Sequence, residues 1–226
     1  MKKFAGGFMI AFLMTCSFTV MAADHREAIH DSAQLVQPLL VGMKAPGFIV
    51  RNVEDQAFQF NPESRTRPVV LTFFRGGWCP YCNLHLSELR HAEKQLGEMG
   101  FDIWFISIDK PDLLKASLDD PAIPYSLYSD SSLDATRAFG LAFRVDDETN
   151  SKYLSWDIDL EKASGETHHV LPAPATYIIG TDGVINFAYI NPDYKVRLHP
   201  DVLLAAAKAY SEDADRRLVE MRKRAK

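Results

Sequence analysis

The chain has 226 residues and a formal net charge of −5 at pH 7, with 47% hydrophobic and 24% charged residues. This composition is ordinary for a globular protein, and the length suits one domain that follows a short leader. The mild acidity and the lack of a basic patch interleaved with aromatic residues exclude nucleic acid as an expected partner.

Residues 1–22 predict a secretory signal peptide. Two lysines precede an apolar stretch over residues 4–21, and small residues follow it as a cleavage site. An uncleaved anchor is the alternative, because the apolar stretch is borderline in length for a membrane span. The pattern therefore predicts export to an oxidising compartment, most simply the periplasm. Residues 23–226 are expected to form a single domain, from which cleavage has removed Cys16.

The first half of this domain predicts a helix, a hairpin and a strand that feeds a second helix. Residues 25–40 favour a short helix, and two short strands over 48–53 and 57–60 flank a polar turn, the pattern of a hairpin. The near-continuous apolar run 69–74 indicates a strand covered on both faces of a sheet. Apolar residues over 84–96 then recur at helical spacing.

The second half alternates strands with helices and closes with a hairpin and a helix. The polar stretch 144–171 is interpreted as an insertion with a weak strand pattern at 153–158. The other expected elements are strands over 101–108, 124–128, 175–179 and 184–190, and helices over 109–118, 131–139 and 200–226. This order of elements predicts an α/β fold, with helices flanking a mixed sheet.

Cys79-Pro80-Tyr81-Cys82 stands where the predicted strand 69–74 gives way to the following helix. The N-terminus of a helix carries partial positive charge and free N–H groups, so it stabilises a thiolate. Pro80 fits there because the first helical turn needs no proline N–H. A purely structural disulfide is the alternative, but so small a loop gives little entropic stabilisation. The motif therefore predicts a redox-active dithiol, Cys79 and Cys82.

A metal site is a competing interpretation of the same cysteines. Structural zinc needs four ligands, and the chain has no second Cys-x-x-Cys. His85 follows Cys82 by three residues, and His168 and His169 form a pair, so imidazoles and thiolates together could suit copper. A copper-binding chaperone therefore stays as an alternative, but these histidines are treated as surface groups. We expect neither a metal nor another cofactor.

Three further motifs accompany the cysteines. Residues 42–48 read Gly-Met-Lys-Ala-Pro-Gly-Phe, residues 174–176 read Pro-Ala-Thr before an apolar run, and Asp182-Gly183 follows as a turn. With a redox motif after the first long buried strand, this order resembles the thioredoxin fold. It resembles most closely the peroxiredoxin branch, the alkyl hydroperoxide reductase and thiol-specific antioxidant (AhpC/TSA) proteins. The resemblance covers about residues 41–210 and implies a thioredoxin-like domain with an N-terminal hairpin and a polar insertion before the last hairpin.

The resemblance also implies a chemistry. Laid on the peroxiredoxin motif, Cys82 falls on the cysteine that attacks a hydroperoxide, and Cys79 is the thiol that resolves the resulting sulfenic acid. An external dithiol, such as a thioredoxin-like protein, would then reduce the disulfide, and a homodimer is compatible with the family. Arg75 and Cys79 replace the family's proline and threonine, so the chain looks like a subgroup with a thioredoxin-style Cys-x-x-Cys.

Laid on thioredoxin instead, the same motif makes Cys79 the attacking residue and Cys82 the resolving one. The alternative function is then a thiol–disulfide oxidoreductase that acts on protein disulfides. Thioredoxins keep a buried acid on the strand before the motif, whereas residues 71–74 contain no carboxylate. That difference disfavours fast disulfide exchange.

Four residues besides the cysteines and Pro80 are expected to shape the site. Arg75 would hold the thiolate or a peroxide oxygen through its fork of N–H groups, with a solvated loop arginine as the alternative. Trp78 and Tyr81 would form a partly exposed wall beside the thiols. Pro174 falls on the cis-proline that faces the active cysteines in the thioredoxin fold, so a cis peptide bond is expected before it, with Pro172 as the alternative for that role.

Overall fold

The computed structural model describes residues 26–116, 126–211 and 221–224. The predicted signal peptide, its cleavage site and Cys16 lie outside these residues. None of the helices within them is both long and apolar enough to cross a membrane.

A mixed seven-stranded sheet organises the molecule, in the strand order β2-β1-β5-β4-β3-β8-β9. Strands β3, β4 and β5 are parallel, and β8 and β9 extend the sheet as antiparallel neighbours. The strands are β1 (Phe48–Arg51), β2 (Ala57–Phe60), β3 (Val69–Phe73), β4 (Asp102–Ser107), β5 (Ser126–Ser129), β8 (Ala175–Ile179) and β9 (Ile185–Ile190). The predicted hairpins and buried strands are confirmed, with their ends displaced by one to a few residues.

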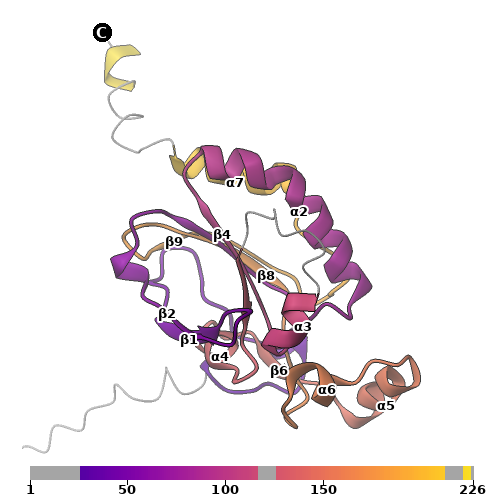
Figure 1. Cartoon of the computed structure of the whole chain (residues 1–226). Coiled ribbons are helices and arrows are strands. Elements are labelled where there is room, and N and C mark those ends of the chain that lie inside the picture. The colour runs from indigo at the N-terminus through magenta and orange to yellow at the C-terminus, as the bar shows by residue number, and fades with distance from the viewer. Residues whose placement is uncertain (1–25, 117–125, 212–220, 225–226) are drawn as a thin grey trace, which may run out of the picture.

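Successive residues of a strand point to opposite faces of the sheet, and in the central strands both sets are apolar. Helices therefore cover the sheet on both faces. All five residues of β3 are buried. Val70 packs with α2 (Pro80–Glu98) and α7 (Pro200–Ser211), which lie side by side on one face (Figure 1). Leu71 packs on the other face, in a cluster with residues of the hairpin and of α4 (Asp134–Ala138). α3 (Pro111–Ala116) follows β4. The expected layered α/β architecture is confirmed.

The predicted helix over 25–40 is wrong. Over residues 27–40 of that segment, the one helical piece is a short 3-10 turn, η1 (Ala33–Leu35), and the rest is irregular. Its backbone N–H groups are used elsewhere: His30, Gln37 and Leu39 donate to carbonyls of residues 139–142. These long-range bonds replace the local bonds that a helix would need.

The polar insertion is helical where a weak strand was expected at 153–158. It forms α5 (Asp147–Ser155) and α6 (Leu160–Ser164) between β6 (Ala142–Arg144) and β7 (Val170–Pro172), which pair as a small separate sheet. Asp146 accepts the Thr149 N–H at 2.8 Å, and Asp159 accepts the Lys162 N–H at 2.9 Å. These N-caps satisfy free donors of the first turn and so favour helix over strand.

Candidate active site

The Cys-x-x-Cys motif stands at the junction between β3 and α2. Cys79 is the N-cap residue of α2 in an extended conformation, and Pro80 occupies the first helical position. The Cys82 N–H donates to the Cys79 carbonyl at 3.0 Å, which closes the first turn. Both sulfurs are free thiols, and both residues are buried, Cys79 at 1% exposure and Cys82 at 0%. The predicted dithiol therefore lies at the predicted place in the fold.

The two thiols differ in acidity although they share one helical turn. A hydrogen bond from the Cys82 thiol lowers the pKa of Cys79 to about 6, aided by the charges of Arg75 and Arg197 and opposed by burial. Burial raises the pKa of Cys82 well above its usual value, and the hydrogen bond to Cys79 adds to that rise. Cys79 is therefore the thiolate of the pair near neutral pH, while Cys82 keeps its proton.

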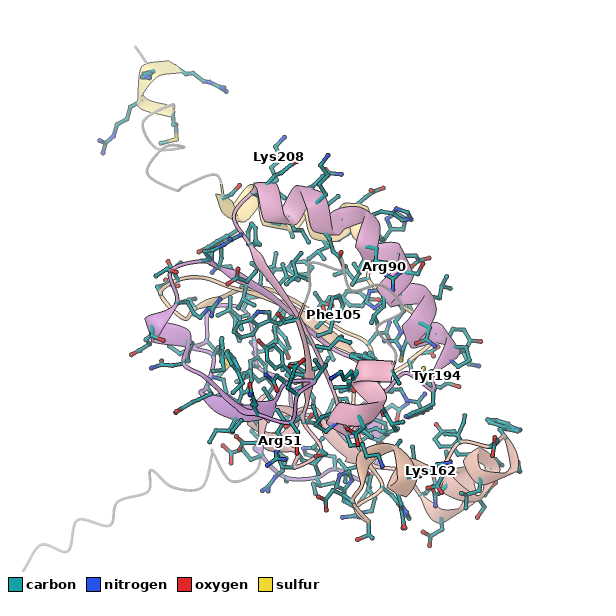
Figure 2. All side chains as sticks on the ribbon, in the orientation of Figure 1. Arg51, Arg90, Phe105, Lys162, Tyr194 and Lys208 are labelled. Atoms are coloured by element: carbon teal, nitrogen blue, oxygen red, sulfur yellow. The ribbon has the colours of Figure 1, made fainter. Side chains whose placement is uncertain are left out.

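Arg197 reaches this pair from the loop before α7. Its Nη2 donates to Cys82 Sγ at 3.1 Å, and its Nε donates to the Tyr194 carbonyl at 2.7 Å. Tyr194 in turn stacks edge-on against Tyr81 of the motif, with ring centroids 5.6 Å apart. Figure 2 places Tyr194 and Lys208 toward opposite ends of α2. No pattern in the sequence predicts Arg197 as a site residue, because it lies 115 positions from Cys82 and belongs to no motif.

Arg75 is buried, so the alternative of a solvated loop arginine is wrong. Its guanidinium lies 4.1 Å from the Tyr194 ring centroid and 5.1 Å from that of Trp78. A terminal nitrogen donates to the Tyr153 hydroxyl, which comes from α5 of the insertion. Three aromatic rings thus hold a positive charge that stabilises the Cys79 thiolate. Trp78 is half-buried and Tyr81 is 40% exposed, as a wall of the site requires.

A buried acid, Asp109, lies against the loop that precedes the motif. Its Oδ2 accepts the Gly77 N–H at 2.7 Å, and a Cβ on Gly76 would lie only 2.6 Å from its Oδ1. Burial raises the pKa of Asp109 to about 7, against the opposing effect of hydrogen bonds with the Gly77 N–H and the Trp78 side chain. The sequence analysis looked for such an acid on the preceding strand, whereas it follows the neighbouring strand β4. A glycine pair next to the motif was the available signal, because only glycine permits this close approach.

The predicted cis bond before Pro174 is wrong: the residues that the structure describes contain no cis peptide bond. Ala173 and Pro174 join β7 to β8. The Ala173 N–H donates to the Leu141 carbonyl, and the Pro174 carbonyl accepts the Asn191 N–H. Both bonds tie the backbone around the proline to neighbouring segments. Pro174 still contributes to the site, since it lines a cavity of about 210 Å³ together with Arg75, Tyr153 and Tyr194.

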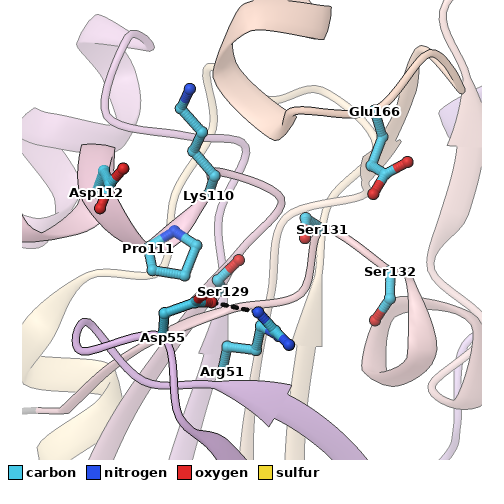
Figure 3. Close-up of a pocket in the computed structure, with 9 residues that line it drawn as sticks. All are labelled: Arg51, Asp55, Lys110, Pro111, Asp112, Ser129, Ser131, Ser132 and Glu166. Carbon is cyan, nitrogen blue, oxygen red and sulfur yellow. Dashed lines mark hydrogen bonds and ion pairs between the residues drawn. The ribbon is translucent and has the colours of Figure 1, made fainter.

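Figure 3 shows a larger cavity of about 460 Å³, whose lining includes neither cysteine. Arg51 and Asp55 pair across its floor, and Lys110 and Glu166 contribute further charges. Neither cysteine lines this cavity or the 210 Å³ cavity near Arg75, so the position of the two thiols at the start of α2, and not a cavity, defines the candidate redox site.

The histidines of the copper alternative are not gathered at the thiols. His168 accepts the Val170 N–H at 2.9 Å, and His169 pairs with Glu161 at 2.9 Å. His85 is buried, so its treatment as a surface group is wrong, and burial with the nearby Arg197 lowers its pKa to about 4. Within the described ranges no three His, Cys, Asp or Glu residues form a group suited to a metal ion.

Comparison with known proteins places this geometry in a family. The sequence profile described as "AhpC/TSA family" matches residues 41–188. "Peroxiredoxin Bcp" of Escherichia coli (strain K12) is 25% identical over 170 residues, which cover 75% of this chain and 96% of that protein. The matched residues include the motif at residues 42–48, the two cysteines and the Pro-Ala-Thr motif at residues 174–176.

Solved structures agree in fold. "Peroxidoxin BcpB from Mycobacterium tuberculosis" superposes with a TM-score of 0.57 at 19% identity, covering 75% of this chain and 96% of its own. "Thiol peroxidase from Chromobacterium violaceum" gives 0.58 at 13% identity, covering 80% and 90% respectively. At these identities the structures show the fold, and the profile shows the family. The chain belongs to the AhpC/TSA family and is a thioredoxin-fold, peroxiredoxin-like enzyme of the thiol-dependent peroxidase class.

Proposed function

We propose that this enzyme reduces hydroperoxides with the Cys79–Cys82 pair, and that Cys79 is the attacking thiolate. The observation that carries the proposal is the opposite displacement of the two pKa values within one helical turn. Peroxide attack needs a thiolate, and the acidity of Cys79 supplies one at neutral pH. This assignment departs from the sequence overlay, which favours Cys82.

In the oxidative half of the proposed reaction, the two cysteine sulfurs supply both electrons that reduce the peroxide. The Cys79 thiolate attacks the distal peroxide oxygen, an S–O bond forms, the O–O bond breaks, and the alkoxide or hydroxide leaves with a proton from solvent. Arg75 stabilises the negative charge before and during this step. Cys82 sulfur then attacks the Cys79 sulfenic acid, so that an S–S bond forms and water leaves.

Recycling requires an external dithiol, because the reaction leaves the enzyme oxidised by two electrons. A thiolate of that partner attacks the disulfide, and Cys82 departs as a thiolate beside Arg197, whose 3.1 Å contact with its sulfur stabilises the charge. A second thiol of the partner then releases the reduced enzyme. A dithiol protein of the thioredoxin type fits this role.

Single-cysteine variants test the assignment. We expect Cys79→Ser to be inert toward hydrogen peroxide and organic hydroperoxides, because its remaining thiol is buried and protonated. Cys82→Ser should react once and stop at a sulfenic acid that dimedone labels, as mass spectrometry of the reacted protein would show. A labelled Cys79→Ser and an inert Cys82→Ser would reverse the order to the one that the sequence overlay implies.

The second candidate function, exchange with protein disulfides, has one observation in its favour. The acidic N-cap thiol of Cys79 is also the thiol that a disulfide-exchange enzyme needs. The same variants separate the two functions. Failure of both variants to form a sulfenic acid, with mixed disulfides accumulating on Cys82→Ser, would replace peroxide reduction with disulfide exchange.

A further inference from the structure

Arg75 is a buried cation without an acidic partner. The residue is 3% exposed, and no carboxylate of the described residues forms an ion pair with its guanidinium. Within the same ranges its one side-chain hydrogen bond goes to the neutral Tyr153 hydroxyl, and its Nε is buried without a partner. The rings around it offset part of the cost of burying this charge, but a counter-charge is needed for the rest. An anion is therefore expected beside Arg75.

In the reduced enzyme the Cys79 thiolate supplies a negative charge near this guanidinium. The hydrogen bond from Cys82 lowers the pKa of Cys79, and the charge of Arg75 lowers it further. The attraction between the two charges is mutual, so the thiolate stabilises the guanidinium in return. The Cys79–Cys82 disulfide carries no charge. Oxidation of the pair therefore removes this counter-charge and leaves Arg75 uncompensated.

A cavity of about 210 Å³ lies against Arg75. Neither cysteine belongs to its lining, so an occupant would lie beside the guanidinium and not on the sulfurs. Much of its wall consists of rings, contributed by Phe143, Tyr153, Pro174, Pro192 and Tyr194. The cavity thus places apolar surface next to a buried cation.

Four charged side chains line this cavity, and Arg75 is the buried one among them. Arg144, Asp31 and Asp146 are exposed. Asp146 is also engaged in capping α5, where its carboxylate accepts the Thr149 N–H and the Thr149 hydroxyl, both at 2.8 Å. Water screens exposed charges much more than buried ones, so the two carboxylates oppose the field of Arg75 only weakly. The cavity therefore favours an anion.

The chemistry of the lining selects a small carboxylate among anions. The planar fork of guanidinium N–H donors matches the two oxygens of a carboxylate, and Arg75 has donors that no described residue uses. The rings of the wall accept an apolar body. A volume of about 210 Å³ is below that of sites for drug-sized ligands, so this body is limited to a few carbon atoms.

We propose that the cavity beside Arg75 binds a small carboxylate, and that it does so preferentially when Cys79 and Cys82 form a disulfide. The carboxylate takes the place of the thiolate as the counter-ion of Arg75. No covalent bond changes on binding, and the preference needs only that the disulfide forms, whichever oxidant makes it. Because linkage is reciprocal, a ligand that prefers the oxidised enzyme favours disulfide formation by the same factor. Small carboxylates thus shift the thiol–disulfide balance of the enzyme toward the disulfide.

Butyrate is the probe for this site, and butyramide, which has nearly the same shape without the charge, is its control. Calorimetric titrations are made at neutral pH and constant ionic strength, on reduced enzyme and on enzyme oxidised with diamide. We expect the oxidised form to bind butyrate with a dissociation constant on the order of 1 mM, and the reduced form to bind it about tenfold more weakly. Equal affinity of the two forms for butyrate, or equal binding of butyramide, would overturn the proposal. So would a lack of binding to the oxidised enzyme at about 50 mM butyrate.

Replacement of the guanidinium locates the ligand. We expect Arg75→Gln to weaken butyrate binding to the oxidised enzyme by about tenfold or more, because the amide keeps a donor but no charge. Arg51→Gln is the matched control, since Arg51 pairs with Asp55 and lines the other cavity, and it should bind butyrate as the wild type does. Undiminished binding in Arg75→Gln would place the ligand elsewhere and refute the assignment.

A measurement on the wild type keeps the proposal testable if Arg75→Gln does not fold. The balance between thiols and disulfide is set with reduced and oxidised 2-mercaptoethanol, both of which are uncharged. Excess butyrate should raise the equilibrium constant for disulfide formation toward the factor that separates the two affinities, about tenfold, and butyramide should leave it unchanged. A constant that butyrate does not move would contradict the proposal. Since no peroxide enters these experiments, failure of the proposed peroxidase function leaves their outcome intact.

Discussion

At the scale of residues, one turn of helix makes two chemically identical thiols different. Cys79 lies at the N-cap, where the charges of Arg75 and Arg197 both lower its pKa, whereas Cys82 is enclosed by the core and its sulfur contacts Cys79 and Arg197. One charge comes from Arg75, in the loop between β3 and Cys79, and the other from Arg197, far along the chain in the loop before α7. The acidity of the pair is therefore a property of the folded molecule and not of the tetrapeptide.

Replacement of Arg197 tests this electrostatic account. We expect Arg197→Met to raise the pKa of both cysteines, because the positive charge lowers both in the wild type. The rise in the pKa of Cys79 would be visible as a shift in thiolate absorbance at about 240 nm during a pH titration. Arg51→Met is the control, since Arg51 pairs with Asp55 outside the site. An unmoved titration would refute the contribution of Arg197.

At the scale of elements, helix α7 supports the site by packing against α2. Leu203 is 1% exposed and lies in the cluster that also contains both cysteines and Leu89 of α2. The loop that carries Arg197 leads directly into this helix. Stable packing of α7 is thus a condition for the contact between Arg197 and Cys82.

We expect Leu203→Ala to lower the free energy of unfolding by about 2–5 kcal/mol, because it leaves a cavity in that cluster. Val202→Ala, on the same helix but 50% exposed, should change it by less than about 0.5 kcal/mol. Urea denaturation followed by circular dichroism measures both variants. Equal losses in the two variants would show that α7 does not bury this side chain in solution.

The sequence predicted those elements whose patterns are local. β3 carries an unbroken apolar run, and β1 of the hairpin alternates buried and exposed residues. The Cys-x-x-Cys motif marks the start of α2. The irregular segment before η1 and the helices α5 and α6 were missed, because His30 pairs with Phe143 across 113 residues and polar caps fix the insertion. Arg197 and Asp109 were missed for the same reason: tertiary packing brings them to the thiols. Whether Cys82 or Cys79 attacks stays a prediction.

At the scale of the whole molecule, three buried carboxyls among the residues that the structure describes affect the response to pH. Burial raises the pKa of Asp109, Asp130 and Glu93 to about 7 each. In the unfolded chain such groups titrate near pH 4, so the folded protein binds more protons over the interval between these values. The free energy of unfolding should therefore fall as pH rises from about 4 to about 7, which is opposite to the usual effect of paired surface carboxylates.

Asp130 offers the cleanest test, because it is fully buried and accepts the N–H groups of Ala135 and Thr136 at the start of α4. Between pH 5 and pH 8 we expect the wild type to lose about 2 kcal/mol more stability than Asp130→Asn, whose amide cannot ionise. Urea midpoints at the two pH values measure the difference. The exposed variant Asp112→Asn should follow the wild type, and a wild type that gains stability over this interval would contradict the assignment.

The placement of both sulfurs on one turn also has a consequence for how the enzyme behaves when it is scarce. An enzyme whose resolving thiol belongs to another chain must find that chain before each cycle can close, so dilution slows it and oxidation changes its size. Here the closing bond joins residues three positions apart. Under the mechanism we propose, disulfide formation is therefore first order in enzyme. A single copy completes the oxidative half of its cycle as quickly as a concentrated solution does, and it depends on encounters only for peroxide and for the reductant.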